Sequence, residues 1–300
     1  MVKSNCFILL IVLLCVSFSV TPCKTIFADD KELKPEEVVA EHLKSIGSPE
    51  ILAGIKNRGI GGIVGVDFVQ GGYGKMIGDF MLVSAGQMLG MVMDYGALEY
   101  PWEYFAFDGE EVTVENISPG QRSPLADFIY RYDGLTKEGL LGGTLSVAWP
   151  LLEVEEKQPK LKYDKEKVEG RQLHKLEYDS KAGLDRVKVK IYFDLETFRH
   201  VRTEYRLRVR SDMSLQADAF VTEGGETRSA GIHDAAEDSI YVLVEKFDYF
   251  KEVDGLMLPH SYYIEYSVQG RGNSFIANYS IEAKEIIHNG KVNSEFFKVQ

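Results

Sequence analysis

RHVRTEYRLRVR, residues 199–210, alternates apolar and charged side chains with a period of two. In an extended chain, one side carries Val201, Thr203, Tyr205, Leu207 and Val209, and the other carries His200, Arg202, Glu204, Arg206, Arg208 and Arg210. This pattern is typical of an antiparallel strand with one buried face and one solvated face. It predicts a β-sheet protein in which His200 and the arginines face solvent.

Similar alternation recurs along most of the chain. The other predicted strands lie at about 59–70, 73–84, 87–96, 103–108, 111–117, 187–193, 215–221, 241–250, 258–268 and 274–283. Turn sequences such as EVDG and QGRGN separate several of them. The sequence therefore predicts about 10–11 strands in one large antiparallel sheet. No linker or fixed repeat divides residues 29–300, which are expected to form a single domain.

Two stretches have helical spacing instead. Pro35, followed by two glutamates, predicts a helix that ends at Gly47, and Ser48-Pro49 predicts a second, shorter one. In SPLADFIYRYDGLTKEGLLGG (123–143), a serine cap and a proline precede an apolar face, which predicts a helix over 123–140. That helix is expected either to fill the core of the sheet or to form a lid over a ligand cavity.

The glycine-rich stretch RGIGGIVGVDFVQGGYGK (58–75) raises the question of a phosphate-binding loop. Gly74-Lys75 is followed by Met76, where a phosphate loop needs Ser or Thr, and position 69 is Val instead of Gly. A predicted helix precedes the stretch and strands follow it, which is the reverse of the order in nucleotide-binding motifs. We therefore interpret the glycines as bulges and bends of a strongly curved sheet.

Residues 1–28 have the pattern of a cleaved signal peptide, with an apolar run at 6–20 and small Ala28 at the expected cleavage site. An exported protein in the periplasm or the extracellular medium is expected. All three cysteines lie in this leader, so disulfides, thiolate metal sites and cysteine nucleophiles are not expected in residues 29–300. Without the leader, 32 basic and 46 acidic residues give a net charge of −14, which argues against nucleic acid as a partner.

Signals for catalysis or metal binding are weak. No Gly-x-Ser-x-Gly elbow is present, and the six histidines lack metal-ligand spacing. HDAAED (233–238) is interpreted as a solvated acidic loop in preference to a calcium site. The arginines of 202–210 favour a solvated strand face over a groove for polyanions. We expect no catalytic residue, no metal and no cofactor, and hence a protein that is not an enzyme.

EKFDYFKEVDGLMLPHSYYIEYS (245–267) resembles the carboxyl half of the LolA/LolB-like outer-membrane lipoprotein-sorting superfamily. Weaker similarity to the same superfamily occurs in VEGRQLHKLEYDS (168–180), VKIYFDLETFRHVRTEY (189–205) and NGKVNSEFF (289–297). The resemblance spans most of residues 35–297. It implies an incomplete, strongly curved antiparallel barrel with helices on its concave side, where acyl chains are held. It also implies an arginine that latches a lid, but the motifs match that arginine to no position in this sequence.

The leading hypothesis is a periplasmic carrier that buries a lipid or lipoprotein acyl chain for transport or sorting in the cell envelope. Five methionines within 75–96 fit an adaptable apolar site and fit ordinary core packing equally well. The residues expected to line the cavity are Met81, Met91, Met93, Phe193, Tyr205, Leu207, Leu243, Phe247, Tyr262 and Tyr266. Leu125, Phe128, Ile129 and Tyr132 are expected to face it from the lid helix.

Three other hypotheses remain open at this point. An envelope sensor or scaffold that binds a protein partner predicts a filled interior and an exposed apolar patch. A hydrolase needs a polar cleft with a perturbed Asp or Glu. An outer-membrane barrel is disfavoured by the charged strand faces and the amphipathic helix.

Overall fold

The computed structural model describes residues 33–72, 74–184, 186–209, 238–270 and 274–299. The leader at 1–28, the predicted strand at 215–221 and residues 233–237 of the acidic loop lie outside the described residues. Within the described ranges, no helix is both long enough and apolar enough to cross a membrane.

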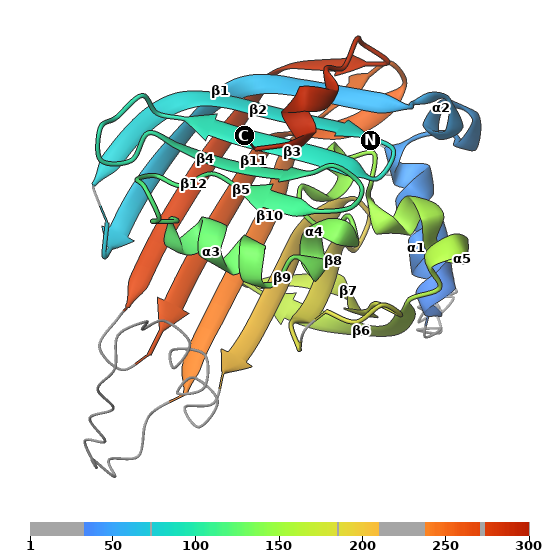
Figure 1. The fold of residues 1–300 in the computed structure, drawn as a ribbon. Coiled ribbons are helices and arrows are strands. Elements are labelled where there is room, and N and C mark those ends of the chain that lie inside the picture. The colour runs from blue at the N-terminus through green and yellow to red at the C-terminus, as the bar shows by residue number, and fades with distance from the viewer. Residues whose placement is uncertain (1–32, 73, 185, 210–237, 271–273, 300) are drawn as a thin grey trace, which may run out of the picture. The chain divides into compact units, whose positions relative to one another are not determined.

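Twelve strands of the described chain form one antiparallel sheet (Figure 1). They are β1 (Asn57–Gln70), β2 (Lys75–Ala85), β3 (Met88–Asp94), β4 (Trp102–Phe107), β5 (Val112–Val114), β6 (Lys160–Val168), β7 (Arg171–Asp179), β8 (Lys188–Asp194), β9 (His200–Val209), β10 (Ser239–Val253), β11 (Leu256–Gln269) and β12 (Phe275–His288). The predicted single curved sheet is confirmed. β6 and β7 were missing from the predicted set, and in β6 exposed charged residues largely replace the apolar side of the pattern.

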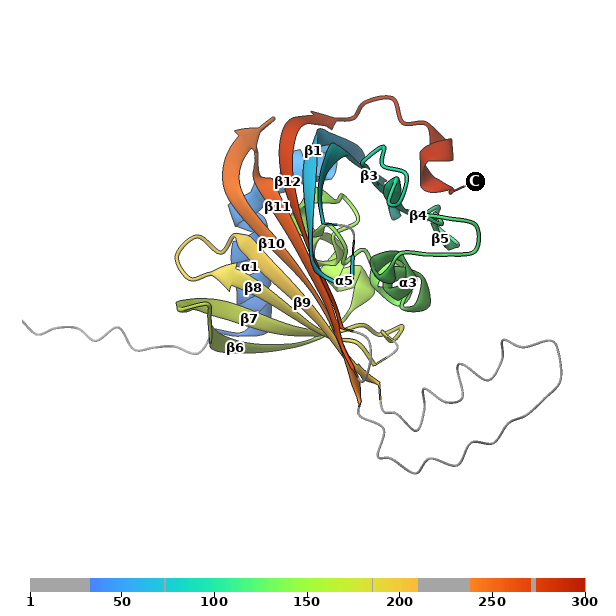
Figure 2. The same ribbon diagram turned by 90° about the vertical axis from the view of Figure 1, so that its left-hand side faces the viewer.

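The strand order is β5-β4-β3-β2-β1-β12-β11-β10-β9-β8-β7-β6. From the middle of the sheet, β1 to β5 follow one another to one edge. β6 lies at the other edge, and β6 to β12 follow one another back to the middle, where β12 pairs with β1. The two edge strands, β5 and β6, do not pair, so the sheet stays an open, curved half-barrel (Figure 2). Because β5 and β6 follow each other in sequence, the chain between them has to pass from one edge of the sheet to the other.

That connection lies on the concave face and is not the single helix predicted for 123–140. It contains α3 (Pro124–Arg131), α4 (Gly134–Lys137), α5 (Val154–Lys157) and the short 3-10 turns η1 (Gly143–Leu145) and η2 (Pro150–Glu153). The helix ends early because Tyr132 leaves the helical region, with φ −117° and ψ 49°. We call residues 123–157 the covering segment.

The amino-terminal helices match the prediction. α1 (Pro35–Ile46) ends at Gly47, and α2 (Pro49–Gly54) begins after Ser48, whose side chain accepts a hydrogen bond from the Ile51 amide. The buried face of α1 carries Val38, Val39, His42 and Ile46. This helix packs against β6, β11 and η2, so it closes one end of the half-barrel.

One strand prediction is wrong at its beginning. His200 is buried, although simple alternation placed it on the solvent face. Tyr192 pairs with Arg202 and Phe193 pairs with His200, so Val201 is an extra residue that forms a bulge in β9. A bulge shifts the alternation by one residue, which turns the His200 ring to the same face as Tyr205.

The glycines of β1 shape the sheet, as predicted. The register between β1 and β12 shifts between Gly61 and Gly62. A Cβ atom at Gly62 would lie 2.2 Å from the carbonyl oxygen of Glu282, whereas one at Gly59 would meet no atom within 4 Å. Gly62 therefore allows the backbones of β1 and β12 to approach at the bulge.

This contrast gives a stability test within one strand. Gly62→Ala is expected to lower the free energy of unfolding by about 1–3 kcal/mol, because the new methyl group collides with neighbouring backbone. Gly59→Ala is the matched control and is expected to leave that free energy unchanged or to raise it slightly. Urea unfolding monitored by circular dichroism measures both, and an equal effect of the two substitutions would contradict this account of the bulge.

The concave face and its covering segment

Nine of the ten residues expected to line a cavity lie buried within the sheet. They are Met91, Met93, Phe193, Tyr205, Leu207, Leu243, Phe247, Tyr262 and Tyr266. The placement expected for Met81 is wrong, because its side chain is 47% exposed. From the covering segment, Leu125, Phe128 and Ile129 are buried and Tyr132 is half-buried. The ring centroids of Phe128 and Tyr266 lie 5.5 Å apart, so the helix and the sheet are in direct contact.

The interior between sheet and segment is filled. Met91, Leu125, Leu141, Leu243 and Tyr262 are among the residues around a void of about 10 Å³, which is no larger than one water molecule. The segment packs closely where Gly143, at φ 48°, meets the sheet: a Cβ atom there would lie 2.5 Å from the His200 ring. In this arrangement, side chains of the protein itself occupy the place that the sequence assigned to a ligand.

A buried carboxylic acid on β10 holds the middle of the segment. The Glu245 side chain accepts a hydrogen bond from the Gly142 amide at 2.8 Å and another from the Tyr262 hydroxyl. Its other oxygen lies 2.7 Å from the Tyr205 hydroxyl, which in turn lies 2.9 Å from the Leu140 carbonyl oxygen. Burial raises the pKa of Glu245. A protonated Glu245 donates to Tyr205, and the Tyr205 hydroxyl is then free to donate to Leu140, so every contact has a hydrogen.

A second buried acid, on β4, holds the beginning of the segment. The Tyr100 hydroxyl donates to Glu103, and the Tyr279 hydroxyl lies 3.0 Å from that of Tyr100. The hydroxyl of Ser123, the cap of α3, lies near enough to Glu103 to lower the pKa of that acid. Burial raises the pKa of Glu103 to about 7, although these three hydroxyl groups act in the opposite direction. The acid therefore titrates near neutral pH while it is in contact with the segment.

A buried arginine at the start of β1 holds the part of the segment that follows Gly143. The Arg58 side chain donates from Nη1 to the Thr144 carbonyl oxygen at 2.6 Å and from Nε to His288 Nε2 at 3.0 Å. His288 Nδ1 lies 2.8 Å from the Asp254 carboxylate. Desolvation lowers the pKa of Arg58 to about 10, so the group remains charged at neutral pH. Arg58 thus ties the segment to the sheet.

α1 contributes a histidine contact to the same segment. The indole Nε1–H of Trp149 donates to His42 Nε2 at 3.1 Å, and His42 Nδ1 lies 3.0 Å from the Phe198 carbonyl oxygen. Nδ1 must therefore carry the hydrogen, and Nε2 must accept. Burial lowers the pKa of His42 to about 4. Protonation of Nε2 would set two N–H groups against each other and break the contact with Trp149.

The remaining attachments are uncharged or lie at the edge of the sheet. The Ser84 hydroxyl of β2 accepts from the Val147 amide at 3.0 Å. Near β7, Glu138 accepts from the hydroxyls of Tyr178 and Ser180. The covering segment is therefore fixed from Ser123 to Trp149 by side chains of α1 and of strands that are far apart in sequence.

The two buried acids do not form a recognisable catalytic site. Glu103 and Glu245 are each 1% exposed, and the void beside Glu245 has room for about one water molecule. The polar cleft that a hydrolase needs is thus missing at both acids. Among the described residues, no group of three or more His, Cys, Asp or Glu side chains could hold a metal ion.

Comparison with known proteins gives a likeness only among solved structures. No protein-family model and no curated protein matches the chain. The chain is similar to the crystal structure of a LolA superfamily protein from Nitrosomonas europaea, with 11% identity and a TM-score of 0.41 over 89% of this chain and 99% of that one. This is the superfamily that the sequence motifs resemble.

Two more solved structures are similar at a lower level. A chain of the MucA/MucB complex from Pseudomonas aeruginosa is 11% identical, with a TM-score of 0.22 over 84% of this chain and 99% of that chain. A chain of MucB in complex with MucA(peri) is 9% identical, with a TM-score of 0.21 over 86% of this chain and all of that one. At these identities the likeness to the LolA superfamily protein and to the MucB complexes concerns the fold alone.

Four residues that hold the covering segment were missed at the level of sequence. Glu245 stands between Leu243 and Phe247 on the apolar side of its strand, and Glu103 precedes Phe105 in the same way. An acidic residue at an inward position of a strand was therefore a sign of a buried polar contact. His42 follows Val38 and Val39 on the buried helix face. Arg58 gave no such signal, because it begins a strand next to glycine.

Glu103 makes stability depend on pH. Its pKa is about 7 in the folded protein and about 4.5 when unfolded, so its contribution is complete below pH 4.5 and is lost as the pH rises through 7. Glu103→Gln removes this titration. Between pH 4.5 and pH 8.5, the wild type is expected to lose about 3 kcal/mol of unfolding free energy relative to the variant. If the unfolding free energies of the two proteins, measured in urea, change equally across that pH range, the assignment is refuted.

His42 acts in the opposite direction. Its pKa is about 4 in the folded protein and about 6.5 when unfolded, so its contribution is complete above pH 6.5 and is lost as the pH falls towards 4. Over that range the wild type is expected to lose about 3 kcal/mol relative to His42→Gln. The difference between the two proteins in urea unfolding isolates His42 from other acid effects. A difference independent of pH would show that His42 is not a buried neutral histidine.

Proposed function

We propose that this protein is an exported, non-enzymatic binding protein of the cell envelope that takes up the acyl chain of a lipid or lipoprotein. The chain would lie against the concave face of the sheet, in the place that the covering segment now fills. Transport or sorting of that lipid is the corresponding role. The observation that carries the proposal is the wall of apolar and aromatic side chains, from Met91 to Tyr266, beneath a segment with little regular structure.

Burial supplies the binding energy in this scheme. Each methylene group removed from water contributes about 0.8 kcal/mol, so a long acyl chain binds without a charged anchor. A void of about 10 Å³ cannot hold such a chain. Uptake therefore requires the covering segment to withdraw from the sheet.

The contacts that fix the segment are suited to being exchanged. Gly142 and Val147 offer backbone amides, and Leu140 and Thr144 offer carbonyl oxygens, to side chains of the sheet. Water can take over each of these backbone groups once the segment is exposed, so the groups of the segment are not left without partners. The apolar side chains released from the sheet are replaced there by the acyl chain.

Binding of a protein partner is the second candidate. The filled interior agrees with it, and so does a groove of about 560 Å³ between α1, α2 and residues 147–153. Leu43, Leu52, Ile55, Val147 and Leu152 line this groove and are only partly buried. A protein that uses the fold as a scaffold would keep its interior closed and bind its partner on such a surface.

Trp149 reports on the withdrawal of the covering segment. With Trp102→Phe in every protein, Trp149 is the sole tryptophan, since the chain has two. Palmitate is expected to shift its emission to longer wavelength in a saturable way, because the indole leaves the core. The hydrogen bond from the Val147 amide to the Ser84 hydroxyl exists only while the segment is closed. Ser84→Ala removes it, which destabilises the closed state and should tighten palmitate binding by about fivefold.

Ser280→Ala is the matched control, because Ser280 lies exposed on β12 and its substitution should leave palmitate binding unchanged. If palmitate produces no saturable shift in either the wild type or Ser84→Ala, the acyl-binding proposal fails, and a protein that binds a partner with a closed interior becomes the better account.

A further inference from the structure

A second hollow, of about 360 Å³, lies on the opposite face of the sheet from the covering segment. It forms where β9 and β10 separate: their pairing ends at Arg202 and Lys246, and the ends of β10 and β11 bend away from β8 and β9 (Figure 2). The bulge at Val201 lies at this point. Arg171, Arg199, Arg202, Lys246, Phe250 and Tyr263 are among the residues that line the hollow.

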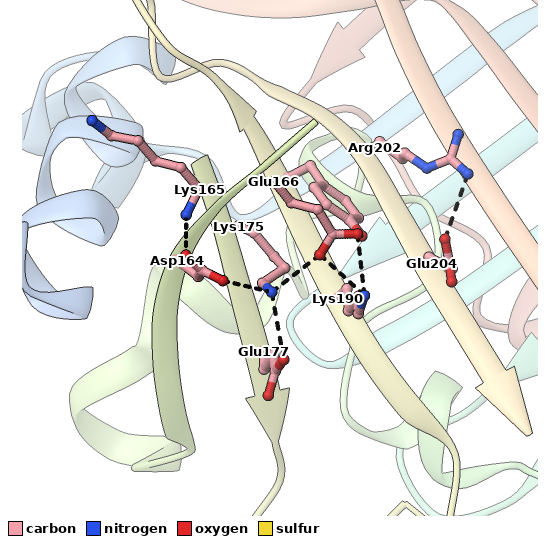
Figure 3. A network of polar contacts seen from close by, with 9 residues as sticks. Asp164, Lys165, Glu166, Lys175, Glu177, Lys190, Arg202 and Glu204 are labelled. Atoms are coloured by element: carbon pink, nitrogen blue, oxygen red, sulfur yellow. Dashed lines mark hydrogen bonds and ion pairs between the residues drawn. The ribbon is translucent and has the colours of Figure 1, made fainter. Parts of the chain in front are cut away.

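The neighbouring surface shows how some cations on this face are neutralised. Lys175 contacts three carboxylates, those of Asp164, Glu166 and Glu177, at 3.0–3.6 Å, and Lys190 also contacts Glu166 (Figure 3). Asp164 faces Lys175 across β6 and β7, and Glu177 faces Lys190 across β7 and β8, so opposite charges meet on neighbouring strands at these positions.

Three of the four cations in the hollow are neutralised in this way. Arg171 contacts Asp194 at 3.0 Å, and Arg202 and Lys246 share Glu169 at 3.0 and 2.8 Å. Arg202 and Lys246 also contact a second acid each, Glu204 and Glu265 respectively. These arginine and lysine charges are accounted for by the protein itself.

Arg199 is the exception. In the described part of the chain its guanidinium group makes no ion pair, and its side chain is half-buried at the wall of the hollow. The group lies 5.3 Å from the centroid of the Phe250 ring, a cation–π contact that leaves its N–H donors unused. Tyr263, 38% exposed, forms a second aromatic wall. The hollow thus combines the unpaired Arg199 with one half-buried ring, Phe250, and one exposed ring, Tyr263, while the Asp248 carboxylate also lines it.

We infer that this hollow binds a small ligand that carries a phosphate or carboxylate group on an apolar or aromatic body. The anionic group would pair with Arg199, whose planar set of donors matches two oxygens of such a group. The body would lie against Phe250 and Tyr263. The volume of about 360 Å³ is that of a small-molecule site. This inference does not depend on acyl-chain binding, because Arg199, Phe250 and Tyr263 are not among the residues proposed to contact the acyl chain.

Either a free small molecule or the headgroup of an anionic lipid could supply this chemistry. Phenyl phosphate is the probe for the first source, because it offers a phosphate for Arg199 and a ring for the aromatic walls. Vesicles of phosphatidylglycerol, compared with vesicles of phosphatidylcholine, are the probe for the second.

Calorimetric titration with phenyl phosphate at low ionic strength tests the site. The wild type and the control Arg206→Gln, which changes an exposed arginine of the adjoining strand β9, are expected to bind alike. Arg199→Gln is expected to bind at least tenfold more weakly. Inorganic phosphate should bind more weakly than phenyl phosphate to the wild type, because it lacks the ring.

Co-sedimentation with vesicles then identifies the source. If Arg199→Gln, but not Arg206→Gln, loses binding to phosphatidylglycerol vesicles, the site is assigned to a lipid headgroup. If Arg199→Gln binds vesicles unchanged but loses phenyl phosphate binding, the site is assigned to a free molecule. The inference is overturned if neither probe binds the wild type, or if Arg199→Gln binds both as the wild type does. Urea unfolding of Arg199→Gln confirms that the variant is folded.

Discussion

The structure depends on one topological constraint: the two edge strands of the sheet, β5 and β6, are consecutive in the chain. Their connection has to cross the whole sheet, and crossing on the concave side buries the apolar faces of both. A curved sheet with an uncovered concave face would expose a large apolar surface to water. The connection therefore supplies the layer of the core that covers the sheet, and Leu125, Phe128 and Trp149 owe their burial to it.

A segment with so little regular structure leaves many backbone groups without partners of their own. Buried amides and carbonyls need hydrogen bonds, so the sheet provides polar side chains at inward positions, including Glu245, Ser84 and Arg58. Burial moves the pKa of Glu103 up and that of His42 down. The same interactions that close the interior thus make its stability depend on pH in two opposite directions, with each group favouring its neutral form.

The two faces of the sheet perform different tasks. The concave face buries apolar side chains under the covering segment, whereas the opposite face of β6, β7 and β8 carries cross-strand ion pairs (Figure 3). The bulge at Val201 affects both faces of the sheet. It turns His200 inward against Trp149, with ring centroids 4.6 Å apart, at the place where β9 parts from β10. One extra residue in a strand therefore shapes both the core and the hollow beside Arg199.

The sequence by itself determined the elements whose pattern is local. Alternation at 200–210 gave the strand, the Pro35 to Gly47 signals gave α1, and the glycines of 58–75 marked a bulge instead of a phosphate loop. Of the ten sheet residues predicted to line a cavity, nine are buried and Met81 is exposed, and the cavity itself stays a prediction. Only the tertiary structure decided that the interior is filled, because that depends on how the covering segment folds across the sheet. It alone brought Arg58 to Thr144 and His42 to Trp149, since these contacts join residues that are about 90 to 110 positions apart and no local spacing encodes them.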